Sequence, residues 1–287
     1  MLINIIIAVV SVLVLFLVWV AIFDTNRFTI SRYEVSDNRI QKPFKAVVLS
    51  DLHNKQYGKD NNKLIAAIDE EKPDIILIAG DMVNGHPKEK MDVPLNLLEQ
   101  LSKKYPIYYG NGNHEMRMHI YLDDYGDKYD EYTKKLTDLG IKHLVNERVS
   151  LDEYGIEIIG SEISKERYRR FGITPMTEGE MEKDLGKPSD KEYSILIAHN
   201  PDYFKNYVEY GADLVLSGHV HGGIVRIPFV DKGVLSPNIS FFPKYDAGEY
   251  SEKGVTMLVS RGLGAHTIPF RMFNPGDLVV VEFLPED

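Results

Sequence analysis

Five short apolar segments, each rich in β-branched residues and each followed by Gly, Asp, Asn or His, limit the folds open to this chain. They cover residues 44–49, 75–79, 107–109, 195–198 and 214–216. Their apolar residues do not alternate with polar ones, which is typical of strands covered on both faces of a sheet. Helix-like stretches lie between them, at residues 61–71 and 88–104. The order strand, polar turn, helix and strand predicts an α/β fold.

The later part of the chain shows a second strand pattern. Residues 156–159, 223–227, 255–259 and 278–283 are joined by turn-rich connections, which are typical of a mixed or antiparallel sheet. We therefore expect an α/β protein built as a two-sheet β-sandwich flanked by helices. The chain has 287 residues and contains no repeat and no long Gly, Ser or Pro linker after its first segment. Residues 25–287 are therefore predicted to form one domain.

The first segment, residues 2–23, carries no charge, and its only clearly polar side chains belong to Asn4 and Ser11. A helix of this length extends roughly 33 Å, enough to cross a bilayer core of about 30 Å. The segment lacks the basic start and the small-residue cleavage site of a signal peptide. We therefore predict a transmembrane helix over residues 1–24 that anchors a single-pass protein in the cell membrane. Lys and Arg follow this helix and none precedes it, so the positive-inside rule favours a cytoplasmic domain.

Charge and cysteine content exclude several classes of function. The chain has 43 acidic residues against 33 Lys and Arg, a net charge of -10. Such a surface repels phosphates, so a long nucleic-acid partner is excluded, although bound metal ions can reverse the sign locally for a small phosphorylated substrate. The absence of cysteine excludes thiolate zinc sites, iron–sulfur clusters and a Cys nucleophile.

Polar residues that can bind metal follow all five apolar segments. They are Asp51 and His53 in SDLH, Asp81 in AGDMVNG, Asn113 in GNGNHE, His199 in IAHNPD, and His219 and His221 in SGHVHGG. Ligands gather at the carboxyl ends of strands in α/β sheets, so we expect these side chains to meet there. In an extended strand, residues two apart point to the same side, which would bring Asp51 toward His53 and His219 toward His221.

The donor atoms in this set are carboxylate oxygen, amide oxygen and imidazole nitrogen. Without thiolate, they suit borderline divalent ions such as Mn, Fe or Zn. Seven ligands exceed the needs of one ion. They suit two ions that share a carboxylate at about 3.5–4 Å, an arrangement used for displacement at phosphorus.

The order D-x-H, GD-x-x-(D/N), GNHE, H and GH-x-H resembles the calcineurin-like metallophosphoesterase family. The following segments HGGIVRIPF, LSP, KYDAGEY, VSRGLG and PFRMFNPG are similar to its membrane-anchored bacterial phosphodiesterase branch. The resemblance extends over residues 44–283, nearly all of the chain after the first helix. It implies the αββα sandwich of that family and a metal-dependent phosphoric ester hydrolase of the phosphodiesterase or pyrophosphatase type.

The resemblance also implies a role for each residue that matches the motif. One metal ion would be held by Asp51, His53 and His221, the other by Asn113, His199 and His219, with Asp81 bridging them. A hydroxide between the two ions would attack phosphorus, and His114 would protonate the leaving oxygen. The family often has a second Asp three residues after the bridging one, and this chain has Asn84. Its amide would accept a hydrogen bond from His114 without adding charge, so we expect N84D to move the alkaline limb of the pH–rate profile upward.

Other residues could reach the substrate. Arg261 and Arg271 could clamp a phosphate, and His86 and His266 could approach it, although packing or surface positions are the favoured interpretation of all four. His119 and His143 are expected at the surface or behind the site.

The sequence therefore predicts a membrane-anchored phosphoesterase with two divalent ions that hydrolyses phosphodiester or pyrophosphate bonds, with lipid-linked or envelope substrates favoured by the anchor. Two alternatives remain. One is a metal-binding scaffold that has lost catalysis, although such a scaffold has no need of His114. The other is a phosphoprotein phosphatase, which would want a basic, exposed cleft. No protein partner is evident.

Overall fold

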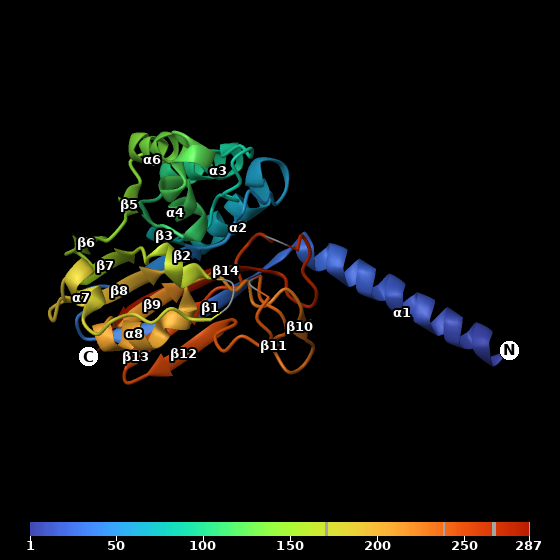
Figure 1. Ribbon diagram of the computed structural model, residues 1–287. Coiled ribbons are helices and arrows are strands. Elements are labelled where there is room, and N and C mark those ends of the chain that lie inside the picture. The colour runs from blue at the N-terminus through green and yellow to red at the C-terminus, as the bar shows by residue number, and fades with distance from the viewer. Residues whose placement is uncertain (170–171, 238, 266–267, 287) are drawn as a thin grey trace.

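The computed structural model describes residues 1–169, 172–237, 239–265 and 268–286 (Figure 1). A six-stranded sheet begins the globular part, with the strand order β1, β14, β2, β3, β4, β5. Its strands are β1 (Phe28–Asp37), β14 (Gly276–Pro285), β2 (Phe44–Leu49), β3 (Ile75–Ala79), β4 (Ile107–Gly110) and β5 (Lys142–Leu144). Strands β2 to β5 run parallel, whereas β14 is antiparallel to β2.

A second six-stranded sheet has the order β12, β13, β9, β8, β7, β6. Its strands are β12 (Gly248–Glu252), β13 (Val255–Val259), β9 (Leu214–Ser217), β8 (Tyr193–Ala198), β7 (Ile156–Ser161) and β6 (Glu147–Leu151). Its four inner strands are parallel and its two edge strands are antiparallel to their neighbours. A separate hairpin pairs β10 (Arg226–Ile227) with β11 (Lys232–Gly233), so little of the strand predicted at 223–227 forms.

The two sheets pack face to face, with helices on both outer faces (Figure 1). Buried side chains between the sheets include Val48 and Leu77 from the first and Ile158, Ile197 and Leu216 from the second. The outer face of the first sheet is covered by α2 (Asn62–Glu71), α3 (Asp92–Ser102), α4 (Asn113–Ile120), α5 (Leu122–Tyr125) and α6 (Lys128–Asp138). The second sheet packs against α7 (Glu180–Leu185) and α8 (Phe204–Tyr210). The predicted two-sheet α/β architecture is confirmed, since apolar strands without alternation are buried on both faces.

The five segments that carry the candidate ligands divide between the two sheets. Strands β2, β3 and β4 belong to the first, and β8 and β9 belong to the second. Their carboxyl ends meet at one end of the sandwich, where the His199 ring Nδ1 lies 2.6 Å from the Ala79 carbonyl oxygen of β3. The site is therefore assembled across the interface between the sheets.

Helix α1 (Leu2–Thr25) projects from the globular part, and most of its side chains are exposed (Figure 1). Its 24 residues include a window with a mean hydropathy of 3.3, and only 6% of that window is buried. By length and composition it can cross a membrane, a property that signal sequences share.

Candidate active site

The turns that follow the strands give the candidate ligands an unusual backbone. The φ angles are 50° at Asp51, 45° at His53, 54° at Asp81, 71° at His219 and 56° at His221. Residues with a Cβ rarely adopt these left-handed values, which cluster at functional sites. The paired residues therefore converge through left-handed turns beyond the strand ends, and the explanation from strand alternation was wrong.

One cluster joins Asp51 and His53 of the first sheet to His221 of the second. The His221 Nε2 atom lies 3.3 Å from Asp51 Oδ1 and 3.1 Å from His53 Nε2. The third pair, His53 Nε2 and Asp51 Oδ1, is 3.8 Å apart. All three side chains are buried.

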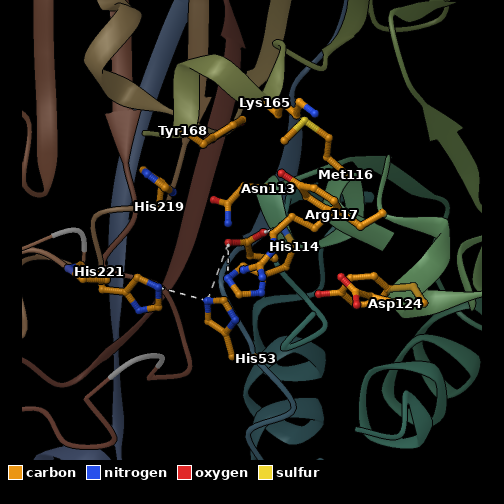
Figure 2. A pocket seen from close by; sticks show the side chains of 14 residues that line it. His53, Asn113, His114, Met116, Arg117, Asp124, Lys165, Tyr168, His219 and His221 are labelled. Carbon is orange, nitrogen blue, oxygen red and sulfur yellow. Dashed lines mark hydrogen bonds and ion pairs between the residues drawn. The ribbon is translucent and has the colours of Figure 1, made fainter. Parts of the chain in front are cut away.

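A second cluster joins Asp81 of the first sheet to His199 and His219 of the second. The Asp81 Oδ2 atom lies 3.0 Å from His199 Nε2 and 3.9 Å from His53 Nε2. Asp81 therefore belongs to the second cluster and also faces His53 of the first. The side chain of Asn113 points into the same space (Figure 2), and its buried Oδ1 atom has no hydrogen-bond partner among the described residues.

The buried carboxylates make the site strongly attractive to positive charge. Burial alone would raise the pKa of Asp51 and of Asp81, but neighbouring imidazoles lower both below the usual range. Although burial opposes the charged ring, the two carboxylates raise the pKa of His199 to about 10. Burial lowers the pKa of His219 to about 3, which favours the neutral imidazole that binds metal.

These observations fit a divalent cation in each cluster. Carboxylate oxygen and imidazole nitrogen are the donors that Mn, Fe and Zn prefer. The candidate ligand atoms of each cluster lie within 4.8 Å of one another, and the buried amide oxygen of Asn113 supplies an additional acceptor beside the second cluster. The arrangement can therefore hold a pair of cations and direct them at an anionic group.

A family model described as calcineurin-like phosphoesterase matches residues 44–223, more than half of the chain. The chain belongs to the calcineurin-like phosphoesterase family. The predicted family and reaction class, a metal-dependent phosphoric ester hydrolase, are thereby confirmed.

Three known proteins illustrate the similarity. Over 273 residues the chain is 28% identical to an uncharacterized metallophosphoesterase of Campylobacter jejuni, and the match covers 94% of this chain and 67% of the relative. It is 26% identical over 195 residues to the phosphodiesterase YaeI of Escherichia coli, with 66% and 64% covered. A solved NAD nucleotidase of Haemophilus influenzae shows 15% identity and a TM-score of 0.40, and the match covers 77% of this chain and 45% of the nucleotidase.

In this phosphoesterase, Glu115 connects the turns that carry the ligands. Its carboxylate accepts hydrogen bonds of 2.9 Å from the backbone N–H groups of Asp81, Met82 and Gly112. The Tyr109 hydroxyl donates another, at 2.7 Å. Burial raises the pKa of Glu115 to about 7. Sequence reasoning noted Glu115 only as part of the GNHE motif, and its contacts show that it positions Asp81.

His114 lies beside the second cluster, with its Nε2 atom 3.8 Å from Asp81 Oδ2. Its Nδ1 atom contacts the backbone carbonyl oxygen of Asn84 at 2.6 Å, whereas the Asn84 side chain donates to Glu89. The predicted hydrogen bond from His114 to the Asn84 amide is therefore wrong, because the backbone takes that place. Without that hydrogen bond, the physical reason for expecting N84D to shift the pH–rate profile is lost.

A cavity of about 480 Å³ opens in front of the two clusters. Arg117, Lys165 and Tyr168 line it, and Figure 2 shows them around the imidazoles. The Tyr168 ring packs edge-on against His219, with the centroids 5.2 Å apart. Sequence reasoning missed these residues. Arg117 lies one helical turn after His114, and that spacing could have indicated it.

Three of the other predicted substrate residues, Arg261, Arg271 and His86, do not line the cavity. The Arg261 guanidinium donates to Thr29 and pairs with Asp277. Arg271 is buried, and its guanidinium donates to backbone carbonyl groups, including that of His221. Among the described residues that line the cavity, neither arginine nor the exposed His86 is found, and His266 lies outside the described residues.

His119 and His143 were expected at the surface or behind the site, and neither is among the described residues that line the cavity. His119 is exposed and stacks on Tyr129. His143 is half-buried, and its ring contacts the Asn111 side chain at 2.7 Å. His119 lies in α4 and His143 in β5, and neither belongs to a candidate ligand cluster of the described residues.

Proposed function

We propose that this chain is a membrane-anchored phosphoesterase that uses two divalent cations to hydrolyse a phosphodiester or pyrophosphate bond in a small or lipid-linked substrate. The observation that carries the proposal is the position of Asp81, whose carboxylate belongs to one buried cluster of ligand-type side chains and also faces His53 of the other. A scaffold without catalysis would not require a cavity with basic residues in front of those clusters.

The residues for each cation follow from the clusters. Asp51, His53 and His221 would hold one ion, Asn113, His199 and His219 would hold the other, and Asp81 would be shared. When bound, two such cations supply Lewis acidity and lower the pKa of a water molecule into the working range. Mn, Fe and Zn all suit this donor set.

The protein's own side chains orient the substrate and move its protons. Arg117 and Lys165 line the mouth of the cavity and would bind the anionic group, which the overall net charge of -10 would otherwise repel. The contact between His114 Nδ1 and the Asn84 carbonyl group orients that ring and supports a role for Nε2 in protonating the leaving oxygen. The Tyr168 ring packs edge-on against His219.

The experiment uses the full chain purified in detergent. Turnover of bis(p-nitrophenyl) phosphate, a diester, is measured with added Mn²⁺ and compared with the monoester p-nitrophenyl phosphate. We expect metal-dependent turnover of the diester, and Asp81→Asn should lose it. Metal binding without turnover of either ester would reject the hydrolase and favour the scaffold. Faster turnover of the monoester would reject the diesterase assignment.

The membrane anchor is a separate part of the proposal. Helix α1 is long and apolar enough to span a bilayer, and the Lys and Arg that follow it favour a cytoplasmic domain. The protein should remain with membranes after extraction at alkaline pH, and its domain should resist protease added outside intact cells. Release into the supernatant would contradict the anchor, and cleavage in intact cells would contradict the cytoplasmic side.

A further inference from the structure

A group of apolar side chains lies exposed on the globular part beside the end of α1. Phe229 is fully exposed, and Val230, Phe241 and Phe242 expose more than half of their surface. Phe270 is also partly exposed. We call these five residues the apolar loop surface. Exposed aromatic side chains in such a group mark a contact with another apolar phase.

Backbone hydrogen bonds connect the loops of this surface to one another. The Phe242 N–H donates to the Val234 carbonyl group at 2.9 Å. The Met272 N–H donates to Ile224 at 3.1 Å. The neighbouring Arg271 N–H donates to Thr25 Oγ1, in the last residue of α1, at 2.9 Å. The loops and the end of α1 are therefore held together (Figure 1).

An apolar groove of about 520 Å³ lies between Phe270 and the helix, and its wall on that side runs from Val14 to Asn26, the residue that follows α1. Those residues span about 18 Å along the axis, whereas the whole helix is about 36 Å long and a bilayer core is about 30 Å thick. If α1 crosses the bilayer, the groove lies partly within its hydrocarbon thickness. Trp19 stacks on Phe23 at this level, as expected near an interface.

We infer that the apolar loop surface enters the same membrane leaflet that α1 crosses, so that the domain is held against the lipid by two contacts. The inference rests on the proposed membrane anchor. Its occupant is the lipid bilayer, because Phe270 of this surface lines an apolar groove together with a helix long enough to span one. The aromatic side chains would sit at the boundary between headgroups and acyl chains.

This placement brings the catalytic cavity close to the headgroups. Pro237 lines the cavity together with His221. Pro237, His221 and Phe270 also line a small gap behind that histidine. The apolar loop surface is thus adjacent to the cavity, and a phosphodiester or pyrophosphate in a lipid headgroup could reach it without leaving the membrane.

The chain has one tryptophan, Trp19, which allows a fluorescence test. The full chain carrying Trp19→Phe and Phe229→Trp is reconstituted into vesicles of phosphatidylcholine and phosphatidylglycerol, with part of the phosphatidylcholine brominated on its acyl chains. Because an inserted indole lies about 5–10 Å below the surface, we expect blue-shifted emission and a loss of about half its intensity.

The matched control is Glu153→Trp in the same Trp19→Phe background. Glu153 is exposed and lies in the turn between β6 and β7, away from α1 (Figure 1). Its emission should be unaffected by bromine. Equal quenching at positions 229 and 153 would overturn the inference, and so would a blue shift without quenching, which would indicate contact with a second protein copy.

Two further measurements distinguish a failure of this inference from a failure of the proposed membrane anchor or of the proposed hydrolase. The unmodified chain reports on the anchor through Trp19, so quenching of Trp19 without quenching at position 229 overturns the loop contact alone. If neither is quenched, both the anchor and the loop contact are rejected. Turnover of bis(p-nitrophenyl) phosphate by the Phe229→Trp chain shows that it has folded, and quenching without turnover in the unmodified chain would reject only the hydrolase.

Discussion

Both carboxylate oxygens of Asp81 are held by neighbouring residues. Its Oδ1 atom accepts the backbone N–H of His114 at 2.8 Å, and its Oδ2 atom faces His199 and His53. The Glu115 carboxylate accepts a hydrogen bond from the backbone N–H of Asp81. Residues of α4 hold the backbone N–H and Oδ1 of Asp81, which leaves Oδ2 directed at the imidazoles, as a metal ligand oriented by surrounding hydrogen bonds requires.

The two candidates for proton transfer can be separated by mutation. We expect His114→Ala to lower kcat at least about 10²-fold, because it removes the ring that we propose protonates the leaving oxygen. Asn84→Ala should change kcat by less than about threefold, since its backbone carbonyl group keeps the contact with His114. Steady-state kinetics with a metal assay on both variants measure this. A large loss of kcat in Asn84→Ala at normal metal content would contradict it.

At the residue scale, the sequence identified Asp and His side chains that the structure gathers into clusters, because ligand chemistry depends on side-chain identity. It could not predict that a backbone carbonyl group contacts His114, since every residue has one. It also could not show that Lys165 lines the cavity. Lys165 lies in the short helix that follows β7, a strand whose carboxyl end carried no ligand-type motif.

At the scale of elements, close packing between turns that follow neighbouring strands of the first sheet determines where Asp81 lies. Gly112 immediately precedes α4, and a Cβ there would lie 2.6 Å from the Asp81 backbone nitrogen and overlap the Asp81 carboxylate. The absence of a side chain at this point lets the turn after β4 pack against the turn after β3. The Asp81 position therefore depends on Gly112.

We expect Gly112→Ala to displace Asp81 and to lower metal content and diesterase activity together, by about tenfold or more. Gly140→Ala is the control, because a Cβ there meets nothing within 4 Å and only its positive φ of 73° is strained. That control should lose about 1 kcal/mol of stability and keep its metal. Elemental analysis measures the metal content of both variants, and a normal metal content in Gly112→Ala would contradict the prediction.

Asp246 fixes β11, the strand at the base of the apolar loop surface. Its buried carboxylate accepts hydrogen bonds from the Gly233 N–H, the Lys232 ammonium and the Tyr250 hydroxyl, and it pairs with Arg226. Burial alone would raise its pKa, but these partners lower it below the usual 3.8. We expect Asp246→Asn to reduce the free energy of unfolding by about 1–3 kcal/mol at neutral pH.

The pH dependence of this effect has a definite sign. Because the pKa of Asp246 is lowered in the folded protein, its stabilisation is complete above the usual carboxyl pKa of 3.8 and is lost as the pH falls below that value. Thermal melting of the unmodified chain and of Asp246→Asn should show a Tm difference that shrinks below about pH 4. A difference that stays constant down to pH 3 would contradict the assignment.

The sequence predicted individual strands better than their membership of a sheet. The apolar segments at 44–49, 75–79 and 214–216 all form strands, because their composition favours burial on both faces. Periodicity does not show which sheet a strand joins. β14 returns to the first sheet beside β2, although its segment was grouped with strands of the second.

At the scale of the whole molecule, the candidate metal site connects the two sheets. Asp51 and Asp81 come from turns of the first sheet, and His199, His219 and His221 come from turns of the second. Each cluster contains residues of both sheets. Cations bound there would therefore hold the sandwich closed at this end, and their binding energy would add to the stability of the folded state.

Removing metal should therefore lower the Tm of the full chain in detergent. A cation at 100 times its Kd stabilises the folded state by about 2.7 kcal/mol, which for a protein of this size corresponds to about 5–10 °C. Chelation should lower the Tm by that amount, and added Mn²⁺ should restore it. In Asp81→Asn the shift should largely disappear, because the shared carboxylate is gone. An unchanged Tm on chelation, in protein shown by elemental analysis to have lost its metal, would mean that the cations do not join the sheets.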